Sequence, residues 1–240
     1  MPSDYCLGVV GGMGPLVSAE FLKTIYAIGQ WTREQDAPRV IVYSDPTFPD
    51  RTELLLRGEE EPLASRLGDA IDRLLGAGAT EVVIACVTIH RVLHRLPARL
   101  RAPVVSLIDR ALAEVAASGE RHLLFCTTGT RRLRLFEDHP AWAGVRDRIV
   151  LPDDDDQAAI HQLIYRVKAR QEEELMPNVH RLLAKYRVKS FVAGCTEFHL
   201  AAARIAADAA QTPFIDPLTL VARDAAQGRS AKTAASVVGA

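Results

Sequence analysis

The chain has 240 residues, which is long enough for one or two domains with a substantial core. Apolar residues make up 48% of it and charged residues 25%, as in ordinary globular proteins, so general disorder is excluded. With 29 basic and 30 acidic residues the net charge is −1, and we expect neither a nucleic-acid partner nor a membrane partner. The central apolar run Val82–Val87 is far too short to cross a membrane, and Asp4 stands where a secretory signal would be basic.

Apolar runs that predict strands alternate with amphipathic segments along the whole chain. In Leu63–Leu75, for example, the leucines and Ile71 fall on one helical face. The strand-like runs are apolar at nearly every position, which is typical of parallel sheets covered on both sides, so the sequence predicts an α/β fold. In chain order the predicted strands are Tyr5–Val10, Arg39–Tyr43, Glu81–Cys86, Pro103–Ile108, His122–Cys126, Ile149–Leu151, Ser190–Ala193 and Pro213–Ile215.

The two halves of the chain repeat one pattern. An early strand of each half ends in a turn, Gly11–Gly14 or Thr127–Thr130, and a later strand ends in a cysteine, Cys86 or Cys195. Because ligands of parallel α/β sheets bind beyond the carboxyl ends of the strands, both cysteines would face one cleft. We therefore predict two similar lobes related by a pseudo-twofold axis, each a parallel sheet flanked by helices, with the active site between them.

The polar turn Ser118–Arg121 is the predicted boundary between the lobes. This boundary assigns residues 1–118 to an N-terminal lobe and residues 119–216 to a C-terminal lobe. We expect residues 217–240 to pack back on the N-terminal lobe. The acidic run Asp153–Asp156 is interpreted as a solvated helix N-terminus, where the helix dipole favours carboxylates. We prefer this to a metal loop, because loops that bind hard cations space their carboxylates and include a turn glycine.

The turn Gly11–Pro15 has glycines that let the backbone approach a ligand, and Pro15 suits the first turn of a helix. Its amides could bind a carboxylate or a phosphate. It is neither a P-loop nor a dinucleotide fingerprint, since no Gly-Lys-Ser/Thr follows and Val17 stands in place of the last glycine. An anion site and a purely structural turn both stay open.

Two of the four cysteines are candidate functional groups. A chain of this size needs no disulfides, so we expect reduced thiols in a cytoplasmic protein. Cys6 and Cys126 lie inside strand-like runs and are interpreted as core residues. Cys86 and Cys195 lie at strand–helix turns, where a helix N-terminus lowers the pKa of a thiol from about 8.5 towards neutrality.

A zinc site is the alternative for the first of these cysteines. Cys86, His90 and His94 are four residues apart and could share a helical face. We favour the interpretation without zinc, because Cys86 belongs to the turn and no glutamate adjoins His90 as in zinc proteases. His90 is then a helix-surface residue or supports the site from behind.

An arginine follows the second predicted strand in the loop Phe48–Thr52. Arg51 could hold a substrate carboxylate with two hydrogen bonds. An isolated arginine on a turn is usually no more than an exposed charge.

Taken together, these motifs resemble the cofactor-independent aspartate/glutamate racemases over nearly the whole chain. The order and spacing of the motifs are similar to that family, and the similarity includes a helix whose lysine helps to bind substrate. The matching residues are Leu7–Pro15, Pro49–Thr52, Cys86–His90, Thr127–Thr130, Ile164–Lys168 and Gly194–Glu197.

The resemblance implies an amino-acid racemase that needs no cofactor or metal, binds a small-molecule amino acid and forms a homodimer. Cys86 and Cys195 would be the catalytic pair, one as thiolate base and the other as thiol acid, on opposite faces of the α-carbon. The hydroxyls, amides and cations of the substrate-binding residues would stabilise the anion that forms. These implied residues are Met13, Arg51, Val87, Thr88, Thr127, Thr130, Lys168 and Thr196.

Three positions depart from the family pattern. One residue is missing between Tyr165 and Lys168, Arg170 replaces a glycine, and Val87 replaces an asparagine. Valine has no hydrogen-bonding group, so we expect a substrate less polar than aspartate or glutamate to be preferred. Two other functions stay open, namely a related cysteine-dependent isomerase or decarboxylase and a non-catalytic carboxylate-binding homologue.

Overall fold

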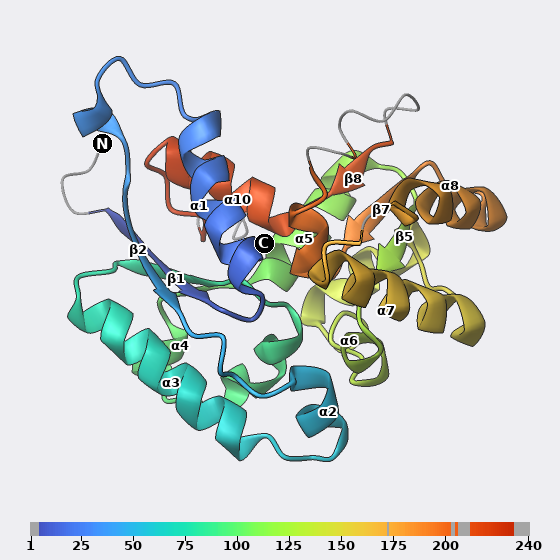
Figure 1. The fold of residues 1–240 in the computed structure, drawn as a ribbon, viewed down its shortest axis with the longest axis horizontal. Coiled ribbons are helices and arrows are strands. Elements are labelled where there is room, and N and C mark those ends of the chain that lie inside the picture. The colour runs from blue at the N-terminus through green and yellow to red at the C-terminus, as the bar shows by residue number, and fades with distance from the viewer. Residues whose placement is uncertain (1–4, 172, 203–204, 206–211, 233–240) are drawn as a thin grey trace.

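Two parallel four-stranded sheets form the two lobes of the chain (Figure 1). The structure is a computed structural model, and it describes residues 5–171, 173–202, 205 and 212–232. The strand order is β2-β1-β3-β4 in one sheet and β6-β5-β7-β8 in the other, so the predicted repeat of one topology is confirmed. The strands are β1 (Cys6–Gly11), β2 (Arg39–Ser44), β3 (Glu81–Ile84), β4 (Val104–Val105), β5 (His122–Phe125), β6 (Ile149–Val150), β7 (Ser190–Ala193) and β8 (Phe214–Ile215).

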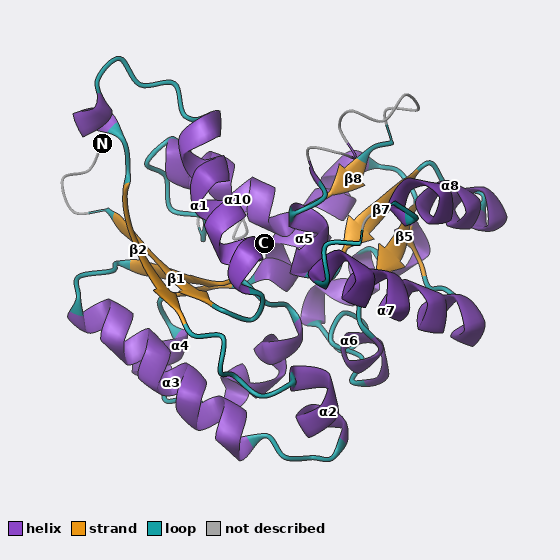
Figure 2. Cartoon of the chain, viewed as in Figure 1, coloured by secondary structure: helices purple, strands orange, loops and turns teal. Residues whose placement is uncertain are grey.

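Helices cover both faces of the N-terminal sheet (Figure 2). The apolar run from Val82 in β3 to Ala85 just after it illustrates this, because its alternate side chains are buried on opposite faces. Val82 and Ile84 pack with the residues of α3, whereas Val83 and Ala85 pack with those of α1 and α5. The helices of this lobe are α1 (Pro15–Ile28), α2 (Arg51–Leu56), α3 (Glu61–Gly76), α4 (Ala98–Arg101) and α5 (Leu107–Ser118).

The C-terminal lobe has its own core on one face of its sheet. Leu123, Phe125 and Phe191 pack there against α7 and α8, and Phe125 stacks on Phe191 with ring centroids 4.7 Å apart. No helix among the described residues is long and apolar enough to cross a membrane. The remaining helices are α6 (Thr128–Arg132), α7 (Asp154–Lys168), α8 (Leu175–Tyr186) and α10 (Pro217–Ala226).

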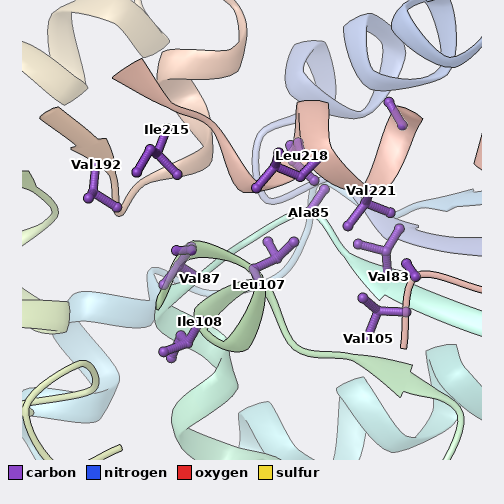
Figure 3. Packing of buried hydrophobic residues seen from close by; sticks show 14 of the residues in the cluster. Val83, Ala85, Val87, Val105, Leu107, Ile108, Val192, Ile215, Leu218 and Val221 are labelled. Carbon is purple, nitrogen blue, oxygen red and sulfur yellow. The ribbon is translucent and has the colours of Figure 1, made fainter. Parts of the chain in front are cut away.

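One apolar cluster is continuous between the two lobes. Val83 from the first sheet and Val192 from the second belong to it, together with Leu107 of α5 and Leu218 of α10 (Figure 3). The helices α5 and α10 therefore fill the space between the sheets, and α10 also packs on α1. The limits predicted for the two lobes stay a prediction, and residues 233–240 lie outside the described part of the chain.

All the predicted strands are present, and several are shorter than predicted, the fourth most of all. The run Pro103–Ile108 forms a strand only at Val104–Val105. Ser106 ends the strand because its hydroxyl accepts a hydrogen bond from the amide of Asp109 at 3.1 Å, and so caps α5. Leu107 and Ile108 are therefore buried by a helix rather than by the sheet.

The acidic run is the N-terminus of α7, as predicted, but its last residue, Asp156, is buried rather than solvated. The Asp153 side chain caps this helix by accepting a hydrogen bond from the amide of Asp156 at 2.9 Å. Lys185 of α8 pairs with Asp153 at 2.7 Å and with Asp156 at 2.5 Å. These contacts lower the pKa of Asp153 to about 2, with the Lys185 hydrogen bond as the largest cause.

Arg170 stands at the end of α7, where the family pattern has a glycine. Its φ of 62° is in the left-handed region, which costs an L-residue about 1–2 kcal/mol. The amides of Arg170 and Gln171 donate to the carbonyls of Val167 at 3.0 Å and Arg166 at 2.9 Å. This pair of bonds is a Schellman motif, whose left-handed position is usually glycine. A glycine would adopt this left-handed conformation without the strain that Arg170 carries.

We expect Arg170→Gly to stabilise the protein by about 1 kcal/mol, which raises Tm by about 2–4 °C. Arg166→Gly is the matched control, because Arg166 is also exposed but has helical geometry. That substitution should lower the stability by about 1 kcal/mol. Thermal unfolding of both variants measures the difference, and a lower Tm for Arg170→Gly would contradict the strain at this residue.

Candidate active site

Cys86 and Cys195 come from matching positions in the two lobes. Cys86 lies two residues beyond β3 and Cys195 two residues beyond β7, and β3 and β7 occupy the same place in their sheets. Both cysteines are free and buried. They line one chamber of about 10 Å³, which has room for about one water molecule. The other residues that line it are Met13, Asp50, Arg51, Thr52, Thr88, Thr127, Lys168 and Glu197.

Arg51 provides the positive charge beside Cys86. It is the first residue of α2, and its guanidinium donates to the carbonyls of Pro49 at 2.9 Å and Met13 at 3.1 Å. Burial lowers the pKa of Arg51, but the charges of Cys86 and Asp50 raise it by more. The arginine is therefore held rigidly against the first thiol, with two of its donors used by the backbone.

The second thiol has the opposite electrostatic environment. Cys195 donates its thiol proton to Oε2 of Glu197 at 2.7 Å. Burial raises the pKa of Cys195 well above its ordinary value, the negative charge of Glu197 raises it further, and Lys168 opposes this only in part. The sequence prediction that a helix terminus lowers the pKa is wrong for this cysteine, because burial and the carboxylate outweigh the dipole.

Glu197 is the main functional residue that was not included in the predicted site. It is only 2% exposed, and its Oε1 accepts no hydrogen bond. The ammonium of Lys168 lies 3.7 Å from Oε1, so Lys168 reaches the site despite the residue missing before it. The glutamate follows Cys195 by two residues, and this spacing is the signal from which its role could have been predicted.

A contact between the lobes closes one side of the chamber. The hydroxyl of Tyr165, on α7, donates to Asp50 at 2.8 Å, and Asp50 is the N-cap of α2. Burial raises the pKa of Asp50, but hydrogen bonds from the Glu53 amide and Tyr165 lower it by more, so the carboxylate stays ionised. Lys168 lies 4.3 Å above the ring of Tyr165, and its ammonium is thus directed towards the chamber.

The four threonines of the predicted site have two different positions. The hydroxyls of Thr88 and Thr127 line the chamber and lie 3.1 Å apart. Thr130 is fully buried behind them, with its hydroxyl 3.0 Å from that of Thr88. Thr196 donates to the carbonyl of Ala85 at 3.0 Å. Thr130 and Thr196 therefore form hydrogen bonds between the two lobes and are not among the residues that line the chamber, and their predicted role in substrate binding stays a prediction.

Val87 also lies away from the chamber. Its side chain is 1% exposed and belongs to the apolar cluster between the lobes, together with Leu107, Ile108 and Val192 (Figure 3). The side chain therefore contacts the shared core rather than the chamber, and its predicted effect on substrate preference stays a prediction.

The two histidines of the alternative zinc site lie in different environments. The Nδ1 of His90 donates to the carbonyl of Cys86 at 2.9 Å, and its Nε2 accepts from the amide of Leu107 at 3.3 Å. Burial lowers the pKa of His90, so the ring is neutral and both nitrogens are used by the backbone. His94 is exposed and lies 3.5 Å from Glu60. His90 thus fixes the turn that carries Cys86, and this geometry gives no support to a shared metal.

A second, larger chamber of about 240 Å³ adjoins the first. The two chambers share Met13, Arg51, Lys168 and Glu197 as walls. A separate hollow of about 880 Å³ beside Tyr5 and Trp31 shares no lining residue with either chamber. The chemistry of the site therefore belongs to the two smaller, connected chambers.

Comparisons with known proteins agree with this fold. The model of the Asp/Glu/Hydantoin racemase family matches residues 10–225. The aspartate racemase of Picrophilus torridus is 23% identical, with a TM-score of 0.76 over 96% of this chain and 97% of that one. An aspartate racemase homologue from Pyrococcus horikoshii is 23% identical, with a TM-score of 0.66 over 92% and 97% of the two chains. The allantoin racemase of Klebsiella pneumoniae is 14% identical, with a TM-score of 0.58 over 98% and 87%.

These likenesses show a shared fold, since the identities are low. The fold predicted from the sequence, with two lobes that each contain a parallel sheet, is confirmed by the strand order and by the structural neighbours.

Replacing the carboxylate beside Cys195 should change the titration of this thiol. Because the negative charge of Glu197 raises the pKa of Cys195, Glu197→Gln should move the titration to lower pH. ¹³C NMR of protein with labelled cysteine Cβ measures it. Glu59→Gln, which removes an exposed carboxylate outside the chamber, should leave the titration in place. An unchanged or raised pKa of Cys195 in Glu197→Gln would contradict the assigned contact.

Proposed function

Because this chain belongs to the Asp/Glu/Hydantoin racemase family, we propose that it is a cofactor-independent amino-acid racemase with Cys86 and Cys195 as its catalytic pair. One observation carries the proposal. Two thiols from equivalent strand ends line a single chamber, and each has a different charged partner, Arg51 for Cys86 and Glu197 for Cys195. Such a pair can present a base and an acid to the two faces of one carbon atom.

The reaction begins with a thiolate at Cys86, whose negative charge is stabilised by Arg51. This sulfur takes the α-proton as the Cα–H bond breaks, and the electron pair stays on the substrate as an enolate-like carbanion. Cys195 then gives its thiol proton to the opposite face of the α-carbon and becomes a thiolate. The other enantiomer reacts by the reverse sequence, so protons balance in both directions.

Glu197 connects the two halves of this cycle. After one conversion Cys86 is protonated and Cys195 is a thiolate, so the starting state must be restored by proton exchange. The carboxylate lies 2.7 Å from the sulfur of Cys195 and can relay a proton to it from solvent, while Cys86 releases to solvent the proton that it took from the substrate. Burial keeps Cys195 a thiol at rest, so this exchange favours the state from which the first step begins.

The substrate is held by charges and hydroxyls that converge on the chamber. The ammonium of Lys168 and the hydroxyls of Thr88 and Thr127 are suitable partners for the α-carboxylate. The free Oε1 of Glu197 is suitable for the α-ammonium. Donors placed on the carboxylate also stabilise the enolate that develops when the α-proton leaves.

Exchange of the α-proton in D₂O tests the activity directly. We expect one deuterium at Cα of each inverted product, because the acid that reprotonates carbon equilibrates with solvent. Chiral chromatography and mass spectrometry of a panel of L- and D-amino acids measure inversion and label together. Release of carbon dioxide would instead support a related decarboxylase, and tight binding without exchange would support a carboxylate-binding homologue.

Removal of either thiol should abolish inversion. We expect Cys86→Ala and Cys195→Ala each to lower kcat by about 10²–10⁴-fold, which is the usual contribution of one acid or base. Cys6→Ala removes a buried thiol outside the chamber and should retain the rate. Near-native inversion by either Cys86→Ala or Cys195→Ala would rule out the two-thiol mechanism.

A further inference from the structure

The larger chamber beside the cysteines has two ends of different chemistry. Its inner end is formed by Arg51, Lys168 and Glu197, which also line the cysteine chamber. The described residues of its outer walls include no charged side chain and no hydroxyl group. They are Gly12, Met13, Gly14, Pro15, Leu16, Val17 and Leu200. An amino acid bound at the inner end would therefore direct its side chain into an apolar space of about 240 Å³.

The charges of the two chambers are already balanced for a substrate with one carboxylate. Among the described residues that line them, the cations are Arg51 and Lys168 and the carboxylates are Asp50 and Glu197. Two donors of Arg51 are used by backbone carbonyls, and its charge faces Cys86. Lys168 is then the cation that remains for an α-carboxylate.

A second carboxylate on the substrate would have no such partner. In aspartate or glutamate it would enter the apolar chamber or approach Glu197, and both positions are unfavourable because burying an unpaired charge is costly. An apolar side chain has no charge to desolvate in this chamber. Each methylene that it buries there raises kcat/KM by about tenfold or more.

We propose that the substrate is an amino acid with an extended apolar side chain, which lies in the chamber lined by Pro15, Leu16, Val17 and Leu200. This inference rests on the racemase activity proposed above and specifies its substrate class. Methionine and leucine are suitable probes, since both have an uncharged side chain of several heavy atoms. Alanine is the reference, because its methyl group is too short to fill the chamber.

The wild-type protein should exchange the α-proton of methionine with a kcat/KM at least about tenfold above those of alanine and aspartate. Leu16→Lys should move the preference towards aspartate, because Leu16 is 43% exposed and a lysine there adds a cation to the outer wall. A wild-type protein that prefers aspartate to methionine would overturn the inference and leave the racemase proposal intact.

Gly14→Val tests the chamber itself. The backbone at Gly14 has a φ of −112°, which valine accepts. An added Cβ would lie 3.5 Å from Oε1 of Glu197 and 3.7 Å from Val17. The valine side chain would thus occupy part of the chamber without a severe clash.

We expect Gly14→Val to lower the methionine-to-alanine ratio of kcat/KM at least about tenfold. Gly76→Val is the control, because a Cβ at Gly76 meets no other atom within 4 Å, and it should keep the wild-type ratio. Equal losses for methionine and alanine in Gly14→Val would overturn the assignment of the chamber.

Calorimetric binding separates the two proposals if no amino acid is exchanged. Absence of exchange overturns the racemase activity. The affinities for aspartate and methionine then test the apolar substrate class. Tighter binding of aspartate would overturn it, and tighter binding of methionine would support it.

Discussion

The apolar core between the lobes is the constraint on which the active site depends. Two thiols can act on opposite faces of one carbon atom only if the strand ends that carry them are held at a fixed separation. The cluster that contains Val83, Val192, Leu107 and Leu218 provides this, because it buries side chains of both sheets against α5 and α10. Moving the lobes apart would expose these side chains, which costs about 25 cal/mol per Å² of apolar surface, so this shared core holds the two strand ends together.

The symmetry of the fold does not extend to the charges of the site. Cys86 and Cys195 occupy equivalent strand ends, yet Arg51 lies against one thiol and Glu197 against the other. If both thiols had the same charged neighbours, neither would be favoured as the base that starts the reaction. Here a cation lies beside Cys86 and a carboxylate beside Cys195, so the two lobes have the same topology and differ in the charge next to the thiol.

The sequence is informative about the strands and less so about which side chains face the site. Apolar runs bounded by turn residues predict the strands well, because burial on both faces leaves a continuous signal. Adjacent residues such as Val87 and Thr88 both follow a strand-end cysteine, but one enters the shared core and the other lines the chamber. Which of these two positions a side chain takes depends on how the lobes pack. The spacing of motifs along the sequence carries no information about that packing. The spacing of Glu197 from Cys195 points to its contact with that thiol, but the oxygen that accepts no hydrogen bond becomes apparent only in the packed structure.

Substrate entry follows from the unequal strength of the contacts around the chamber. A space of about 10 Å³ between the thiols cannot hold an amino acid, so one wall must move. The bond from Thr196 to Ala85 is buried beside the shared core and is costly to break. The bond from Tyr165 to Asp50 is exposed, where a hydrogen bond contributes only about 0.5–1.5 kcal/mol. Opening on the side of α2 and α7 therefore gives access from the apolar chamber while the spacing of the two strand ends stays fixed.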